Sequence, residues 1–264
     1  RFLQKWQTTG KKTLTAMMRV KDGADYIEKT LTKLSEMCDA IVVLVDQKTT
    51  DNTYELARKF SKVVRLGKEP PHEYSEAYSR NMILKWAKET EPDWIWCSDV
   101  DEIPEDRLIS NIQGLLNAPD PMTFLYVFQI VQLWNSDVTY RKDGLWGNFL
   151  QGRLFRNLPN QDISNFNDLI HCGSHPNFPA GNVRSTYYRI LHYGNVNPEY
   201  RRKKYEWYTK TDTDLDINMV LGTLKDYYWK QYYGDPQPGE QAEWKILNED
   251  GEGKPKFGNF YRKD

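Results

Sequence analysis

A continuous apolar run at Ala40–Val45 (AIVVLV) restricts the fold of this chain more than any other feature. Runs of this kind, rich in β-branched residues, are typical of a strand that is covered on both faces, as the strands of a parallel sheet are. Trp94–Ser98 (WIWCS) is a second such run, and Thr13–Val20 and Val63–Leu66 are further strand candidates. Because helices must cover both faces of such a sheet, the sequence predicts an α/β fold.

The segments between these strands carry helix signals. Asp25 and Glu28 have the spacing of a capping box at the start of a first helix. Its apolar positions follow at helical spacing: Ile27, Leu31, Leu34 and Cys38. Asp51 or Asn52 is predicted to cap a second helix, and Ser75 precedes a third. The third helix carries large apolar residues four apart: Tyr78, Met82 and Trp86. Strand–helix alternation of this kind predicts a mostly parallel central sheet with right-handed crossovers.

The pattern changes after residue 120. Thr123–Val131 is a predicted long strand, Thr186–Leu191 a short one, and Pro198 to about Lys210 a basic, aromatic helix. The residues between them are rich in turn signals, which predicts a loop-rich region. We therefore divide the chain into two halves of one domain, 13–120 and 121–210, and an extension, 211–264.

Composition excludes several classes of protein. The formal charge is −1, from 36 basic and 37 acidic residues, which argues against a nucleic-acid partner. No stretch approaches the roughly 18 to 20 apolar residues of a membrane-spanning helix. The three cysteines are far apart without a CxxC, so neither a disulfide framework nor a zinc site is expected, and a cytoplasmic location fits. The basic residues 201–204 leave open a peripheral position at the inner face of a membrane.

Polar residues follow three of the predicted strands at their carboxyl ends, where ligands bind in open α/β sheets. They are Lys21-Asp22, Asp46 and Asp99-Val100-Asp101. Asp99 and Asp101 are two apart, so on a strand both carboxylates would point the same way. Hard oxygen ligands suit Mg²⁺ or Mn²⁺ shared with a substrate phosphate. The alternative is an exposed acidic loop that caps the next helix.

Two further positions fit a bound nucleotide. Asp46, at the end of a buried strand, could accept hydrogen bonds from a base or a ribose. Arg80, in Ala77–Asn81, could contact a phosphate, although a solvated helical charge is an equally good interpretation.

Four motifs, in order, resemble the nucleotide-sugar half of the GT-A glycosyltransferases of family 2. Arg19–Asp22 is similar to the turn after that family's first strand. Val45–Thr53 is similar to its V-D-D-G-S-T-D-G-T loop, with Gln47 and Lys48 at the second Asp and the Gly. Ser79–Asn81 is similar to its A-R-N helix, and Asp99–Glu102 to its D-A-D-E sequence.

The second half resembles a subset of the family that includes lipopolysaccharide-core glucosyltransferases. Gly152–Arg156 is similar to their P-R-L-F-R strand, and Leu169–His171 to their V-H-E, with Cys172 where Glu is usual. Leu191–Tyr193 followed by the helix 201–208 is similar to their H-Y and basic-aromatic helix.

The resemblance implies a GT-A fold and a metal-dependent transfer of sugar from a nucleoside-diphosphate sugar, UDP first, to a glycan or lipid-linked saccharide. It implies a nucleotide-sugar site with the following residues: Arg19, Lys21, Asp46, Arg80, Asp99, Arg201 and Lys204. It implies Mn²⁺ or Mg²⁺ as cofactor, with Asp99, Asp101 and His192 as ligands.

The catalytic base is the least defined role, because Cys172 replaces the family's Glu. Asp168 is our first candidate for the base and His171 the second, with Asp162 and Glu102 as alternatives. If no carboxylate lies near the anomeric carbon, a retaining transfer without a dedicated base stays open. The aromatic residues Trp134, Trp146 and Phe149 either line the acceptor side or belong to the core.

The sequence also fits two other functions. A sugar nucleotidyltransferase would share the acidic ligands, but no Gly-rich phosphate loop follows the first strand. A non-catalytic carbohydrate-binding or scaffold module with the same fold would fit the Cys172 departure.

Overall fold

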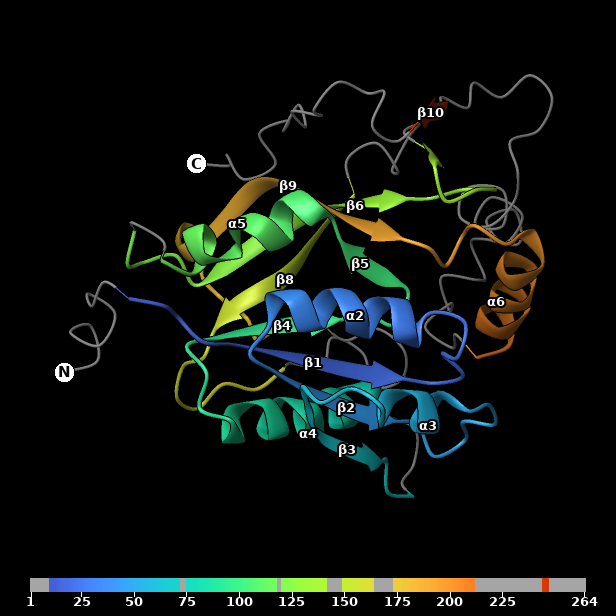
Figure 1. Cartoon of the computed structure of the whole chain (residues 1–264), viewed down its shortest axis with the longest axis horizontal. Coiled ribbons are helices and arrows are strands. Elements are labelled where there is room, and N and C mark those ends of the chain that lie inside the picture. Colours follow the sequence, from blue (N-terminus) through green and yellow to red (C-terminus); the bar gives the residue numbers. More distant parts are fainter. Residues whose placement is uncertain are drawn as a thin grey trace, which may run out of the picture.

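The structure is a computed structural model that describes residues 10–71, 75–117, 120–141, 149–163, 173–211 and 244–246. Its centre is an eight-stranded sheet with the strand order β3-β2-β1-β4-β8-β6-β9-β5 (Figure 1). The strands are β1 (Leu14–Val20), β2 (Ala40–Val45), β3 (Val63–Lys68), β4 (Trp94–Ser98), β5 (Glu102–Pro104), β6 (Leu125–Gln132), β8 (Leu150–Arg156) and β9 (Val183–His192). A separate antiparallel pair joins β7 (Thr139–Arg141) to β10 (Trp244–Ile246).

The sheet is mostly parallel, as predicted. β3, β2, β1 and β4 are parallel neighbours, and β6 is parallel to β9. β8 runs antiparallel between β4 and β6, and β5 runs antiparallel to β9. Strands of both predicted halves thus share one sheet, while the proposed boundaries of the halves stay a prediction.

Helices cover both faces of the sheet (Figure 1). They are α2 (Ile27–Met37), α3 (Thr53–Ala57), α4 (Glu76–Glu89), α5 (Asp106–Leu116) and α6 (Pro198–Thr211), with a short 3-10 turn at Ala180–Asn182. α2, α3 and α5 pack on one face and α4 packs on the other. α6 lies at the end of the molecule toward which β1 points.

Strand β1 shows why the apolar runs are continuous. Leu14, Ala16 and Met18 pack with the α2 side of the core, whereas Met17 packs with the α4 side, and all four are fully buried. Covering both faces of a strand favours apolar residues at successive positions rather than at every second one. The predicted α/β fold is confirmed.

The capping box predicted for the first helix is wrong. α2 begins at Ile27 after Tyr26 without a side-chain cap. Instead the Gly23 carbonyl accepts the Tyr26 and Ile27 amides at 3.0 and 2.9 Å. The Gly23 amide in turn donates to Thr53 Oγ1 at 2.8 Å, so a contact with the first residue of α3 fixes the start of this helix.

The other helix starts follow the predictions more closely. Asp51 Oδ1 accepts the Thr53 amide at 3.0 Å, and Ser75 Oγ accepts the Tyr78 amide at 3.3 Å. The buried face of α4, however, is formed by Ala77, Ser79, Arg80, Ile83, Leu84 and Ala87. Tyr78 is exposed, whereas Met82 and Trp86 are partly buried and pack against the core at the edge of this face.

The second half also contains its predicted elements. β6 and α6 lie close to their expected bounds, and β9 is longer than expected, with ten residues. Most of the 211–264 extension lies outside the described residues. Within the part of the chain that the structure describes, no helix has the length and apolar character that crossing a bilayer requires.

Candidate functional site

The two carboxylates of the Asp99-Val100-Asp101 sequence lie in a turn, not on a strand. β4 ends at Ser98 and β5 begins at Glu102, whose amide donates to the Asp99 carbonyl at 3.2 Å. The alternation that would make both side chains point the same way therefore does not apply. The two carboxylates have different partners, although both remain at the carboxyl end of β4.

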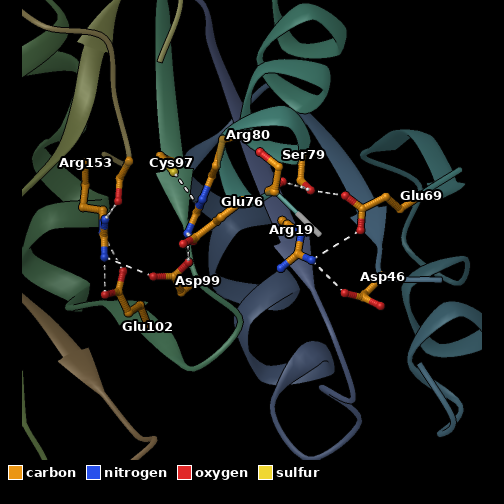
Figure 2. A network of polar contacts seen from close by, with 12 residues as sticks. Arg19, Asp46, Glu69, Glu76, Ser79, Arg80, Cys97, Asp99, Glu102 and Arg153 are labelled. Atoms are coloured by element: carbon orange, nitrogen blue, oxygen red, sulfur yellow. Dashed lines mark hydrogen bonds and ion pairs between the residues drawn. The ribbon is translucent and has the colours of Figure 1, made fainter. Parts of the chain in front are cut away.

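Asp99 is held by two buried arginines. Arg80 on α4 donates to Oδ1 at 2.9 Å, and Arg153 on β8 donates to Oδ2 at 3.1 Å (Figure 2). Burial alone would raise the pKa of Asp99, but the Arg80 and Arg153 guanidinium groups hold the pKa of this carboxyl below its usual range. Asp99 is thus kept ionised and fixed in orientation.

Arg80 is part of this buried network, so its interpretation as a solvated helical charge is wrong. Its guanidinium also contacts Glu76 Oε1 at 3.3 Å and Cys97 Sγ at 3.2 Å. Burial alone would lower the pKa of Arg80, but the neighbouring Asp99, Cys97 and Glu76 raise it well above its ordinary value. The side chain stays a permanent cation inside the protein.

Glu102 is paired with Arg153, which argues against Glu102 as the catalytic base. Arg153 Nε donates to Glu102 Oε2 at 2.7 Å and its terminal nitrogen to Oε1 at 2.5 Å. Such a two-point contact is the strongest arrangement of this ion pair. Arg153 also donates to Ser174. Sequence reasoning did not assign a role to Arg153, although it lies in the Gly152–Arg156 motif.

Asp101 forms a second cluster with His192 at the end of β9 and Lys204 on α6. Oδ2 of Asp101 lies 3.3 Å from His192 Nε2 and 3.5 Å from Lys204 Nζ. Burial alone would raise the pKa of Asp101, but His192 and Lys204 hold the pKa of its carboxyl far below its usual range. The structure thus brings together three of the residues predicted from the sequence.

Gly194 allows this close arrangement. A Cβ at position 194 would meet His192 Cε1 at 2.8 Å and Asp101 Oδ2 at a still shorter distance. The Tyr193 amide donates to the Asp101 carbonyl at 2.8 Å, which ties the end of β9 to the acidic turn.

A third cluster lies at the ends of three neighbouring parallel strands. Arg19 of β1 donates to Asp46 Oδ2 at 2.7 Å and to Glu69 Oε2 at 3.3 Å, after β2 and β3 respectively (Figure 2). Asp46 Oδ1 also accepts the Lys48 amide at 2.7 Å, and Glu69 pairs with Ser79. Glu69 was missed by sequence reasoning, although it follows a strand at the same edge of the sheet.

The remaining predicted site residues lie elsewhere. Lys21 is exposed in the turn after β1. Arg201 is buried, with its guanidinium donating to Asn135 Oδ1 at 2.9 Å and stacking over Trp134, so the structure does not bring it to the acidic turn. Trp134 is fully buried and Phe149 packs against the main core, which favours their interpretation as core residues.

Asp168 and His171, the two candidates for the catalytic base, lie outside the described residues. The same holds for Cys172 and Trp146. Asp162 is described and is exposed.

The residues present fit a divalent cation held by two protein ligands. Among the described residues no group of three or more His, Cys, Asp or Glu side chains is arranged to hold a metal ion, and Asp99 is bound to arginines. Asp101 and His192 remain as a pair, and the buried Nδ1 of His192 has no hydrogen-bond partner in the described part. Mg²⁺ in phosphate-transfer sites needs only one or two protein carboxylates, with waters and phosphates completing its shell.

Comparison with known proteins now assigns the chain to a family. A sequence model described as Glycosyl transferase family 2 matches residues 15–174, more than half of the chain. The chain belongs to this family: it carries a family 2 glycosyltransferase domain, and its fold is the GT-A fold. A search of curated protein sequences found no significant match.

Several solved structures are similar over part of the chain. S. aureus TarS is 12% identical over 83% of this chain and 44% of its own, with a TM-score of 0.49. A TarS structure in complex with UDP-GlcNAc is 12% identical over 83% of this chain and 73% of its own, with a TM-score of 0.48. Glucosyl-3-phosphoglycerate synthase from Mycobacterium tuberculosis, in complex with Mg²⁺ and UDP, is 18% identical over 50% of this chain and 47% of its own, with a TM-score of 0.36. The chain therefore spans less than half of the first of these proteins.

Proposed function

We propose that this protein transfers a sugar from a nucleoside-diphosphate sugar, with UDP as the preferred nucleotide, to a hydroxyl group of a glycan or lipid-linked saccharide. Family membership supports the class of reaction. The observation that carries the proposal is the meeting of three charged clusters, around Asp46, Asp99 and Asp101, at the carboxyl ends of neighbouring strands. This is the edge at which open α/β sheets bind nucleotides.

The cluster of Arg19, Asp46 and Glu69 suits the base end of the nucleotide. Ionised carboxylates are acceptors only, so they pair with N–H groups of a base or with hydroxyls of a ribose. Arg19 bonds to both carboxylates and fixes their directions. A base whose edge offers an N–H donor therefore meets acceptors that are already oriented.

Asp99 suits the ribose. Each of its oxygens accepts one arginine N–H and keeps a further lone pair, and its side chain is 34% exposed despite those contacts. It is therefore accessible to a sugar hydroxyl. Arg80 and Arg153 stabilise the charged form that accepts such a bond most strongly.

Asp101 and His192 would hold the divalent cation, Mn²⁺ or Mg²⁺. When bound, the cation supplies neutralisation of the charge that develops on the leaving diphosphate. Asp101 is kept ionised by its neighbours, so its carboxylate is in the form that can serve as an oxygen ligand. In the free protein Lys204 supplies a positive charge beside this carboxylate.

An inverting transfer also needs a group that takes the proton of the acceptor hydroxyl. Because both oxygens of Glu102 are bound to Arg153, we retain Asp168 as the proposed base and His171 as its alternative. The glycan or lipid-linked acceptor, the cytoplasmic location and a peripheral position at a membrane remain proposals of the same kind.

A donor panel tests the proposed function. UDP-, GDP- and dTDP-sugars are added with and without Mn²⁺, and thermal unfolding and release of free sugar are followed. A ligand present at a hundred times its dissociation constant and bound only to the folded state adds about 2.7 kcal/mol of stability. We expect this gain with a UDP-sugar plus Mn²⁺, and we expect Asp101→Asn to abolish it.

Asp120→Asn is the matched control, because Asp120 is an exposed carboxylate paired with Arg184 at 2.6 Å, outside the three clusters. It should leave the ligand-induced gain unchanged. Stabilisation by a nucleoside triphosphate plus a sugar phosphate would support a nucleotidyltransferase instead. Tight binding of a nucleotide sugar without any release of sugar would support a non-catalytic module.

A further inference from the structure

The ammonium group of Lys204 lies beside the Asp101 carboxylate, which the divalent cation would also bind. Its Nζ lies 3.5 Å from Asp101 Oδ2, the same oxygen that lies 3.3 Å from His192 Nε2. The side chain of Asp101 is 10% exposed and that of Lys204 is 27% exposed. The ammonium therefore reaches inward from a partly exposed helix to a nearly buried anion.

The position of Lys204 is fixed by the first turn of α6. Arg201, three residues earlier and 1% exposed, donates to the Asn195 carbonyl and to Asn135 Oδ1, and its guanidinium lies 4.4 Å from the centre of the Trp134 ring. Residues three apart lie on the same side of a helix. The anchor at Arg201 therefore aims Lys204 at Asp101, and the flexible four-carbon stem of Lys204 allows its ammonium to change direction.

The surroundings of Asp101 Oδ2 leave little room for two cations. His192 and Gly194 pack against this oxygen, and a single methyl group at position 194 would already clash with it. A divalent cation and an ammonium group at one carboxylate also repel each other. Lys204 must therefore leave Asp101 when a cation binds between Asp101 and His192.

We propose that Lys204 is an exchangeable counter-ion: it neutralises Asp101 in the free protein, is displaced by the divalent cation, and then binds the diphosphate of the nucleotide. This inference rests on the proposed function for the identity of the nucleotide. It adds that the cation and the nucleotide bind cooperatively because of Lys204.

The cooperativity follows from a cost that the two ligands share. The cation alone must break the Lys204–Asp101 contact and leaves the ammonium without that carboxylate. The nucleotide alone attracts Lys204 and leaves Asp101 exposed to the diphosphate without a counter-ion. When both ligands bind, the contact is broken once and each charge finds a new partner. Each ligand therefore raises the affinity for the other by the same factor.

Lys204→Met tests the exchange, because Met keeps the length of the stem and the helix propensity without the charge. Isothermal titration calorimetry gives three dissociation constants for each variant: Mn²⁺ alone, UDP alone, and UDP at saturating Mn²⁺. We expect Lys204→Met to bind Mn²⁺ alone about fivefold more tightly and UDP with Mn²⁺ at least about fivefold more weakly than the wild type, the lower end of usual couplings between sites.

Two further variants control the experiment. Lys203→Met removes a charge from the same turn of α6, but Lys203 is 65% exposed and pairs with Glu199, so it should leave all three constants unchanged. Lys204→Arg keeps the charge and should keep most of the coupling. Circular dichroism verifies that α6 and the fold persist in each variant.

The outcomes separate this inference from the proposed function. If Lys204→Met binds Mn²⁺ alone no more tightly than the wild type, the exchange is refuted even where UDP binding is intact. If the wild type binds Mn²⁺, and Lys204→Met binds it more tightly, but neither binds a nucleotide, the proposed function fails while the counter-ion role of Lys204 at Asp101 stands. If the wild type binds neither ligand, both are refuted.

Discussion

Removing the charge of Arg153 should destabilise the protein strongly. Arg153 and Glu102 have side chains that are 5% and 6% exposed, and their two-point contact is 2.5 to 2.7 Å long. Arg153→Met leaves Glu102 buried without a counter-ion and removes one of the two cations on Asp99. Breaking a buried ion pair by removing one partner costs about 3–5 kcal/mol of unfolding free energy.

Urea denaturation measures this cost directly. Arg184→Met is the matched control, because Arg184 pairs with Asp120 at a similar distance of 2.6 Å but with both side chains more than 40% exposed. An exposed pair of this kind contributes about 0–1 kcal/mol. We expect the two variants to differ by at least about 2 kcal/mol, the gap between these ranges.

A double-mutant cycle makes the test specific. Adding Glu102→Gln to Arg153→Met removes the stranded charge, so the double variant should be more stable than the sum of the two single changes predicts. Equal costs for Arg153→Met and Arg184→Met, or additive effects in the cycle, would refute the claim that Arg153 compensates buried charge.

Two further predictions concern packing and pH. Gly194→Ala should lower the unfolding free energy by about 1–3 kcal/mol through overpacking, and it should weaken Mn²⁺-assisted binding of UDP. Gly114→Ala in α5, where a Cβ meets open space, should instead raise the unfolding free energy by about 0.4–1 kcal/mol. Denaturation of both variants beside the wild type measures these changes. Burial lowers the pKa of His175 below its usual 6.5, so the unfolded chain takes up a proton first as pH falls. The stability that neutral His175 contributes should be complete above about pH 6.5 and decline below it, and His175→Gln should flatten the change in unfolding free energy between pH 7 and 5; an unchanged slope would contradict this.

The fold could be predicted because its strands are buried on both faces. The apolar runs at 40–45 and 94–98 appear as β2 and β4 within the central sheet. Polar residues after these strands, such as Asp46 and Asp99, then had to lie at one edge. A continuous apolar run followed by polar residues can be recognised within a single stretch of sequence. The strands and the edge of the sheet at which the polar residues lie could therefore be predicted without knowledge of distant contacts.

The detailed site could not be predicted, because it depends on contacts between distant parts of the chain. Arg153 reaches Glu102 across 51 residues, which requires β8 to lie beside β4. Nothing in the local pattern around Arg153 encodes that pairing. The turn that separates Asp99 from Asp101 likewise depends on where β4 ends, and the start of α2 depends on the contact of Gly23 with Thr53.

The face of α4 shows a related difficulty. Of the large apolar residues four apart on this helix, Tyr78 is exposed, whereas the charged Arg80 is buried. Arg80 lies inside because Asp99, Glu76 and Cys97 provide partners for its guanidinium. The spacing of apolar residues does not identify a helix face that buries a charged side chain together with its partners.

We propose above that a nucleoside diphosphate and a divalent cation bind together at Asp101 and His192. Calorimetric titration of UDP into the protein, with Mn²⁺ and again with a chelator, tests it most directly. We expect binding that requires Mn²⁺ and is lost in both Asp101→Asn and His192→Ala. Binding of equal strength with the chelator, or binding that survives both substitutions, would contradict it.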